Sequence, residues 1–248
     1  MLKKLTWLLT PALLAPVFLG ACVTAPAPVR DGAVDADVDK DDASKNEAAT
    51  NVANLGEQTN LPDVGEFIPD KEVKICAGLR VRNAPVSDAL GRVEKYDRLA
   101  VALDRIVFAP VPLNGGCISS GYGQRNGRLH KGLDISAPRG TLVYSAAPGI
   151  VLEVGWGNGY GNMVLIDHGL GLVTRYAHLD AFAEGLEVGT ELGFGWPIGQ
   201  VGNTSSQRVG VHLHFEMLTG DYNTPKKAFG MDGNDPFSFP VYETAPAS

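Results

Sequence analysis

From about residue 109 onward, short apolar runs alternate with Gly-rich turns, and no other feature of the chain limits the possible folds as strongly. The runs include TLVYSA, GIVLEVG, GNMVLIDHG, GLVTRYAHL and VHLHFEML. Apolar residues at every second position, separated by frequent turns, are typical of antiparallel β structure. We therefore predict a mainly β fold, with an antiparallel β-sheet domain over residues 109–240 and a C-terminal tail over residues 241–248. A segment of about 130 residues is long enough to bury a single hydrophobic core.

The first residues have the layout of a secretory signal. Two lysines precede a mostly apolar run, residues 5–19, and small residues lead into Cys22. A charged start, an apolar centre and a small-residue end are the features of an export signal. Cysteine at the cleavage point resembles the signal of bacterial lipoproteins, which implies a signal peptide over residues 1–21 and a lipidated Cys22 that holds the chain to a membrane surface. A short membrane anchor is the alternative, although two prolines interrupt the apolar run.

Residues 22–60 have the composition of a disordered acidic tether. Seven acidic residues lie between residues 31 and 47, and large apolar residues are almost absent. Such a stretch cannot bury enough surface to offset the entropy lost on ordering, so we expect a flexible linker. The whole chain carries a formal net charge of −7. This charge disfavours nucleic acid and anionic lipid as partners.

Residues 61–108 form a small lead-in in which two patterns overlap. Val73 and Ile75 begin an alternation that predicts a short strand, whereas the apolar residues from Ser87 to Ile106 recur near helical spacing. We expect a helical lead-in that packs on the main domain. The stretch LRVRNAP weakly resembles part of the bacterial SH3-like wall-binding domains.

Cys76 and Cys117 are the cysteines that remain if Cys22 is lipidated. An exported chain meets oxidising conditions, in which disulfides form and persist. A disulfide between the two and a pair of buried free thiols are both consistent with the sequence, because spacing along the chain does not show whether they come close.

Four of the five histidines fall in segments with a metal-site pattern. HKGLD contains His130 and Asp134, RYAHL contains His178, and VHLHFE contains His212 and His214. Side chains two apart point to the same side of a strand, so His212 and His214 share one face. Zinc binds His and carboxylate ligands in a tetrahedral arrangement, and a catalytic site keeps one position for water. Two histidines and one aspartate would leave that position open.

The segments around these residues resemble the lysostaphin/LytM-type zinc metallopeptidases over about residues 115–218. The matching stretches are ISSGYGQR, GRLHKGLDISAPRGTLVYSAAPG, GYGNMVLIDHGLGLVTRYAHL, IGQVGNT and HLHFE. That family cleaves peptide bonds in bacterial peptidoglycan, in the cross-links or in the stem peptides. The resemblance implies a hydrolase of the cell wall, a zinc-dependent endopeptidase with peptidoglycan as its partner.

The same resemblance implies the role of each site residue. One zinc ion would be held by His130, Asp134 and His214. His178 and His212 would be the catalytic histidines, which orient and deprotonate a water molecule and stabilise the oxyanion that forms on attack.

Further residues near these motifs are candidates for substrate contacts. Tyr122 and Tyr160 lie in Gly-rich loops, where a role in packing is the alternative. The loop GNTSSQRVGVH departs from the family pattern and carries Arg208, either a ligand for a stem-peptide carboxylate or a solvated charge. Val211 stands where the family has proline, and the loss of a fixed φ loosens the approach to the H-x-H motif. We expect the fifth histidine, His168, to be structural.

A second hypothesis is a non-catalytic lipoprotein regulator that activates cell-wall amidases, which would make an amidase its partner. The complete histidine set favours the enzyme, because a regulator has no need of metal ligands. Lipoproteins kept at the inner membrane often carry Asp after the cysteine, and this chain has Val23 there. By that resemblance we expect the periplasmic face of the outer membrane, reached through a lipid anchor.

Overall fold

The computed structural model of the chain describes residues 67–78, 83–224 and 226–243. The expected signal peptide, Cys22 and the expected linker lie outside the described residues. The described part belongs to one compact unit of strands and turns, with two short 3-10 helices, η2 (Lys227–Gly230) and η3 (Pro236–Ser238). Within this part, no helix has the length and apolar character needed to cross a membrane.

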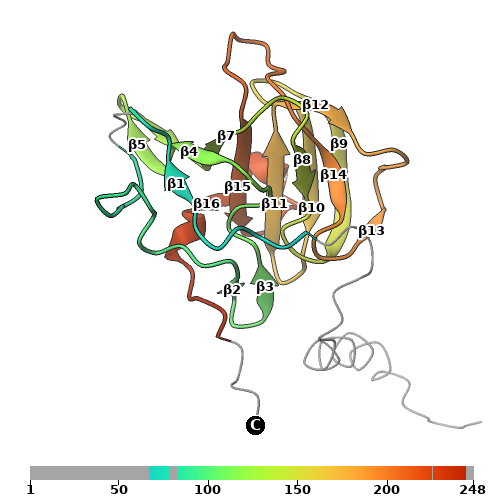
Figure 1. The fold of residues 1–248 in the computed structure, drawn as a ribbon. Coiled ribbons are helices and arrows are strands. Elements are labelled where there is room, and N and C mark those ends of the chain that lie inside the picture. Colours follow the sequence, from blue (N-terminus) through green and yellow to red (C-terminus); the bar gives the residue numbers. More distant parts are fainter. Residues whose placement is uncertain (1–66, 79–82, 225, 244–248) are drawn as a thin grey trace, which may run out of the picture. The chain divides into compact units, whose positions relative to one another are not determined.

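A nine-stranded sheet forms the centre of this unit, in the order β1-β4-β7-β15-β11-β10-β9-β13, with β16 paired to β15 beside this path (Figure 1). Its strands are β1 (Lys74–Ile75), β4 (Cys117–Ser120), β7 (Leu133–Ser136), β9 (Gly149–Gly157), β10 (Gly161–Asp167), β11 (Leu172–Ala177), β13 (Glu191–Leu192), β15 (Leu213–Thr219) and β16 (Asp232–Asn234). Only the pairing of β1 with β4 is parallel among these described strands. The prediction of a mainly β, largely antiparallel fold is confirmed.

Three smaller sheets accompany the central one. The first consists of β12 (Leu179–Phe182), β14 (Pro197–Val201) and β8 (Leu142–Tyr144). The other two are the hairpins β2 (Ala100–Ala102) with β3 (Ile106–Phe108), and β5 (Gly123–Arg125) with β6 (Arg128–His130). Because the second hairpin ends at His130 and leads into β7, it places that histidine beside the central sheet.

Strand β15 shows how the central sheet separates the core from the site. Phe215 and Met217 belong to the main hydrophobic core. Successive side chains of a strand point to opposite faces, so His214 and Glu216 point the other way. Leu218 shares their face and belongs to a second, smaller hydrophobic cluster. The alternation predicted for VHLHFE is therefore present, and it keeps the polar residues out of the main core.

The predicted helical lead-in is wrong. The described residues between 67 and 108 form β1, isolated bridges and the β2–β3 hairpin, and none of them is helical. The apolar recurrence does not mark one face, because Leu90 is 69% exposed whereas Val93 is 7% exposed. Left-handed backbone at Gly91 (φ 76) and Leu103 (φ 52) turns the chain where a helix would have to continue.

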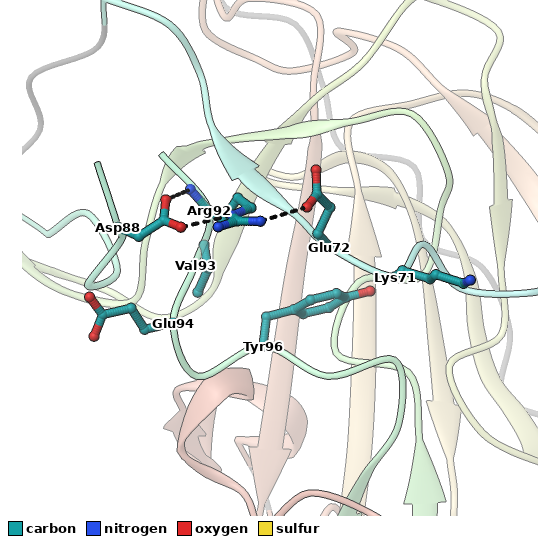
Figure 2. Close-up of a pocket in the computed structure, with 7 residues that line it drawn as sticks. All are labelled: Lys71, Glu72, Asp88, Arg92, Val93, Glu94 and Tyr96. Carbon is teal, nitrogen blue, oxygen red and sulfur yellow. Dashed lines mark hydrogen bonds and ion pairs between the residues drawn. The ribbon is translucent and has the colours of Figure 1, made fainter. Parts of the chain in front are cut away.

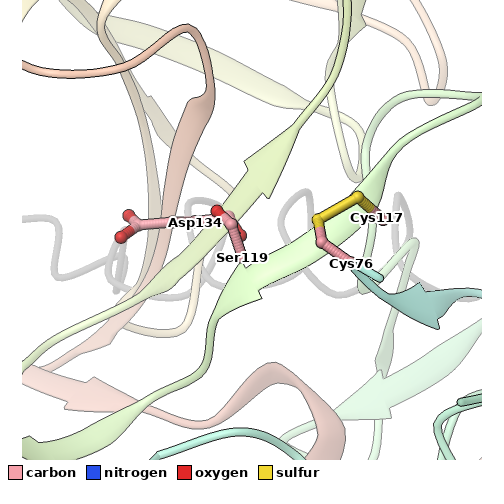
Figure 3. The surroundings of a disulfide bond; sticks show 4 residues. All are labelled: Cys76, Cys117, Ser119 and Asp134. Atoms are coloured by element: carbon pink, nitrogen blue, oxygen red, sulfur yellow. A yellow bond between two sulfur atoms is a disulfide. The ribbon is translucent and has the colours of Figure 1, made fainter. Parts of the chain in front are cut away.

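The lead-in instead forms one edge of the central sheet. The strand predicted from Val73 is present as β1, which pairs with β4. Directly after β1, a disulfide joins Cys76 to Cys117 of β4, with the two Cα atoms 4.9 Å apart (Figure 3). The β2–β3 hairpin contacts the other end of the chain, where the Val101 amide donates to the Pro240 carbonyl at 2.8 Å. Strand pairing, a disulfide and a backbone hydrogen bond therefore join the lead-in to the domain that follows it.

Candidate metal centre

Adjacent strands bring the three predicted ligands together. Asp134 of β7 and His214 of β15 are direct partners in the antiparallel pairing. Side chains of such partners lie on the same face within contact distance. His130 ends β6, four residues before Asp134, and completes the group. All three residues are buried, with 6%, 8% and 7% exposure for His130, Asp134 and His214.

One atom of each residue points into a common centre. His130 Nε2 lies 3.1 Å from Asp134 Oδ1 and 3.2 Å from His214 Nδ1. His214 Nδ1 lies 2.8 Å from Asp134 Oδ1. The remaining carboxylate oxygen, Oδ2, accepts a hydrogen bond from Arg125 Nη1 at 2.9 Å, which leaves Oδ1 free to face the centre.

Hydrogen bonds on the far side of each ring assign the protons. His130 Nδ1 lies 2.6 Å from the Gly121 carbonyl oxygen, which can only accept, so Nδ1 carries the proton. His214 Nε2 lies 2.9 Å from Glu216 Oε1, a carboxylate oxygen, so Nε2 carries the proton there. In the neutral rings, His130 Nε2 and His214 Nδ1 are therefore lone-pair acceptors, like Asp134 Oδ1.

Three acceptors at these distances repel one another unless a positive charge lies among them. Ligands about 2.0–2.1 Å from a tetrahedral zinc ion are about 3.3 Å apart, close to the separations seen here. Imidazole nitrogen and carboxylate oxygen are also donors that zinc prefers. The donor set therefore fits zinc and leaves a fourth position for water.

The pKa shifts of the same groups agree with a centre that attracts positive charge. Burial raises the pKa of Asp134, but hydrogen bonds with His130 and His214 outweigh it and hold that pKa well below its usual range. Burial lowers the pKa of His214, but hydrogen bonds with Asp134 and Glu216 outweigh it and raise that pKa to about 9. Without a metal, a proton would thus occupy the place that a metal ion fits.

The two predicted catalytic histidines border this centre. Their ring centroids are 4.7 Å apart, and His212 Nε2 lies 3.5 Å from Asp134 Oδ1. His178 Nδ1 donates to the Thr204 carbonyl at 2.7 Å, and His212 Nδ1 donates to the Gly210 carbonyl at 2.9 Å. Each ring therefore keeps Nε2 as a free base. Burial lowers the pKa of His178 to about 4 and also lowers the pKa of His212, so both are neutral at pH 7.

The backbone at His178 is itself unusual. Its φ is 62, in the left-handed region that residues other than glycine seldom adopt. Such conformations cluster at functional sites, where the surrounding structure enforces them. Here the His178 amide donates to the Tyr160 carbonyl at 2.8 Å, which helps to hold the turn after β11.

The remaining predicted residues have different surroundings. Tyr160 borders the centre, because its hydroxyl donates to Glu216 Oε1 at 3.0 Å. The Tyr122 hydroxyl donates to the Gly233 carbonyl at 2.7 Å, which is a packing contact. Arg208 is exposed on the loop before the H-x-H motif. His168 lies outside the cluster, with Nδ1 2.7 Å from the Pro148 carbonyl.

Sequence reasoning missed two arginines of this site. Arg125 Nη1 contacts both Asp134 and Ser120 Oγ, the latter at 2.7 Å. Arg175 lies on β11, where its side chain pairs with Glu216. Their positions in the sequence could have indicated both residues. Arg125 lies in the family-like stretch GYGQR, and Arg175 is the one charged residue of the strand LVTRYA.

A polar pocket on the lead-in includes none of the predicted site residues. It is lined by Lys71, Glu72, Asp88, Arg92, Val93, Glu94 and Tyr96 (Figure 2). Its central cation is already neutralised, since Arg92 pairs with Asp88 at 2.7 Å and with Glu72 at 3.7 Å. The converging donor atoms of the metal centre therefore remain the stronger indication of chemistry.

Comparison with known proteins shows which family part of the chain matches. Residues 128–225 match the model of Peptidase family M23. The chain contains an M23 peptidase domain. The match confirms the family resemblance seen in the sequence, and its span includes all five residues predicted as ligands or catalytic histidines.

Similar proteins with names include enzymes and a lipoprotein. The chain is 45% identical over 107 residues to the DD-carboxypeptidase/endopeptidase Mpg of Neisseria meningitidis serogroup B, covering 40% of this chain and 24% of Mpg. It is 40% identical to the uncharacterized lipoprotein YgeR of Escherichia coli (36% and 34% covered). It is 31% identical to the peptidoglycan DD-endopeptidase ShyC of Vibrio cholerae (53% and 31% covered). The chain thus spans only about a quarter to a third of the length of these relatives.

Proposed function

We propose that the chain is a zinc-dependent endopeptidase that hydrolyses peptide bonds in the cross-links or stem peptides of bacterial peptidoglycan. The observation that carries the proposal is the convergence of three lone-pair donor atoms beside two neutral histidines. The M23 domain supports the peptidase class. The names of Mpg and ShyC support an endopeptidase, and that of ShyC supports peptidoglycan as the substrate.

Each site residue would have a defined task. His130, Asp134 and His214 would hold one zinc ion through Nε2, Oδ1 and Nδ1. Zinc, when bound, supplies Lewis-acid polarisation of a peptide carbonyl and lowers the pKa of a water molecule toward neutrality. His178 and His212 are neutral with Nε2 free, so both would accept hydrogen bonds from that water, and one of them would take its proton. The resulting imidazolium would donate from Nε2 to the oxyanion and then pass the proton to the leaving amine.

Substrate contacts are proposed from exposure and hydrogen bonding. Arg208 is exposed on the loop that leads to His212, where its guanidinium would bind a stem-peptide carboxylate through two parallel hydrogen bonds. Tyr160 would border the bound peptide beside the centre. Tyr122 is less suited to this task, because its hydroxyl is already committed to the Gly233 carbonyl.

We also propose that the domain is lipid-anchored at Cys22 on the periplasmic face of the outer membrane. The signal-like first residues support this proposal, as does the lipoprotein name of the relative YgeR. A flexible linker over residues 22–60 would have an r.m.s. span of roughly 35 Å. Such a tether would let the M23 domain reach the cell wall from the membrane.

The test is digestion of purified peptidoglycan by the chain without residues 1–22, with and without a metal chelator, followed by mass spectrometry of the fragments. We expect loss of cross-linked fragments that the chelator prevents and added zinc restores. Intact peptidoglycan, in the presence of folded and zinc-loaded protein, would contradict the endopeptidase. In that case, stimulation of an added cell-wall amidase would support the regulator instead.

A further inference from the structure

A buried carboxylate stands behind His214, on the side away from the metal centre. Glu216 is 1% exposed, and both of its carboxylate oxygens accept hydrogen bonds. Oε1 accepts from His214 Nε2 at 2.9 Å and from the Tyr160 hydroxyl at 3.0 Å. Oε2 accepts from Arg175 Nη1 at 2.5 Å. The carboxylate therefore links a predicted ligand to a buried cation.

Two aromatic rings hold the Arg175 guanidinium next to this carboxylate. The residue is 1% exposed, and its guanidinium carbon lies 4.2 Å from the ring centroid of Tyr160 and 5.2 Å from that of Phe229. Aromatic faces attract a cation without accepting its protons in ordinary hydrogen bonds. Among the described residues, Arg175 Nε has no hydrogen-bond partner. The two rings therefore stabilise the charge of the guanidinium, which donates a hydrogen bond to Glu216.

Stability alone does not account for an ion pair at this position. Burial of two charges carries a large desolvation penalty, and apolar residues of similar size often stabilise the fold equally well. A carboxylate on the outer nitrogen of a ligand histidine has a known physical effect: it fixes the tautomer and the ring orientation and makes the inner nitrogen a better donor. The outer nitrogen of the other ligand, His130 Nδ1, instead faces neutral groups, the Gly121 carbonyl at 2.6 Å and the Ser120 hydroxyl at 3.5 Å.

We propose that Glu216, held by Arg175 and Tyr160, is a positioning residue that presents His214 Nδ1 to zinc and strengthens it as a donor. The proposal rests on the zinc centre proposed above. It assigns the two histidine ligands unequal roles, with His214 as the stronger donor because its partner is charged.

Paired variants of the full chain separate this role from folding. Glu216→Gln alone leaves Arg175 buried without a counter-charge, so the main variant is Arg175→Met with Glu216→Gln, which removes both charges. The matched control is Glu153→Gln on β9. Glu153 Oε1 also accepts from a tyrosine, Tyr222, and pairs with Lys227 at 3.8 Å, but it is not within hydrogen-bonding distance of a predicted ligand.

The measurements are the zinc dissociation constant, by competition with a chromophoric chelator, and the thermal unfolding of the zinc-free protein. We expect the double variant to unfold near the wild-type temperature and to bind zinc about 10–100-fold more weakly. Glu153→Gln should keep the wild-type zinc affinity. Tyr160→Phe, which removes one hydrogen bond to Glu216 and keeps the ring over Arg175, should weaken zinc binding a few-fold.

The outcomes distinguish this proposal from the one on which it rests. Wild-type zinc affinity in the folded double variant would overturn the positioning role. If the double variant does not fold, wild-type zinc affinity in Tyr160→Phe would overturn it. Failure of the wild-type chain itself to bind zinc would instead overturn the proposed metallopeptidase.

Discussion

The four clustered histidines share one arrangement: each has one ring nitrogen committed to an oxygen outside the cluster. The acceptors are the backbone carbonyls of Gly121, Thr204 and Gly210 and the carboxylate of Glu216, for His130, His178, His212 and His214. These bonds fix each tautomer and ring orientation by contacts within the protein. Groups held in this way need little reorganisation when the reaction occurs.

The lowered pKa of His168, which lies away from the metal centre, can be tested through the pH dependence of stability. Burial lowers its pKa to about 4, although the hydrogen bond to the Pro148 carbonyl opposes the shift. The unfolded chain, with a histidine pKa of about 6.5, binds this proton more readily than the folded protein does. The contribution to stability is therefore present above pH 6.5 and is lost as the pH falls toward 4.

We expect His168→Gln to remove this part of the acid sensitivity, because glutamine does not titrate. The free energy of unfolding, measured by denaturant titration at several pH values, should fall less steeply between pH 6.5 and 4 in the variant. The difference between the two profiles should be on the order of 1–3 kcal/mol. Parallel profiles would show that His168 is not buried as a neutral ring.

The site residues were predicted from the H-x-x-x-D and H-x-H patterns together with the resemblance of their flanking segments to the LytM-type peptidases. The sequence did not predict what orients them. Three of the four acceptors are backbone carbonyls, which every residue has. The pairing of Arg175 with Glu216 depends on the register of β11 against β15, in which the two are direct partners. That register is set by the folded sheet.

At the scale of elements, the centre depends on the close approach of β15 to the turn between β6 and β7. Gly132 lies in this turn, between His130 and Asp134. A Cβ atom there would be 2.2 Å from the Phe215 carbonyl oxygen and 2.9 Å from Glu216 Cγ. Any side chain at this position would therefore displace the strand that carries His214.

We expect Gly132→Ala to lower the free energy of unfolding by about 3 kcal/mol or more, as overpacking against backbone does. Zinc binding should weaken with it, because the strand that carries His214 must move. Gly210→Ala is the matched control, since a Cβ atom there meets nothing within 4 Å. Chemical denaturation and chelator competition on both variants give the comparison, and equal values for the two would contradict the close approach.

Sequence patterns predicted some elements of the chain correctly and others wrongly. The five apolar runs named in the sequence correspond to β8, β9, β10, β11 and β15, whereas β6, β7, β12 and β13 were not among the predicted runs. The lead-in gave a false helical pattern, because its apolar residues pack singly rather than along a stripe. Leu90 is exposed and Val93 is buried although they are three residues apart.

At the scale of the whole described unit, the lead-in supports the metal centre through β4. The disulfide joins β1 to this strand, and Ser119 of the same strand donates through Oγ to the Asp134 carbonyl at 3.1 Å (Figure 3). Asn83 of the lead-in donates through Nδ2 to the Gly121 carbonyl, the acceptor of His130. Residues outside the M23 match therefore help to orient two of the three predicted ligands.

We expect the double variant Cys76→Ser/Cys117→Ser to be less stable than the oxidised wild type. The two cysteines are 41 residues apart, and a disulfide across such a loop contributes about 4 kcal/mol by restricting the unfolded chain. Denaturant unfolding in the absence of reductant should show the difference, and reductant should bring the wild type toward the variant. Identical unfolding midpoints for the oxidised wild type and the variant would contradict a stabilising disulfide.

The most direct measurement on the central claim is zinc content and peptidoglycan cleavage, determined together on His130→Ala and His212→Ala. The wild type should hold one zinc ion and cleave. His212→Ala should keep the zinc ion and lose cleavage, because it removes a proton acceptor and leaves the ligands intact. His130→Ala should lose both. Full cleavage by His212→Ala, or zinc retained with activity in His130→Ala, would contradict the division of the cluster into metal ligands and catalytic histidines.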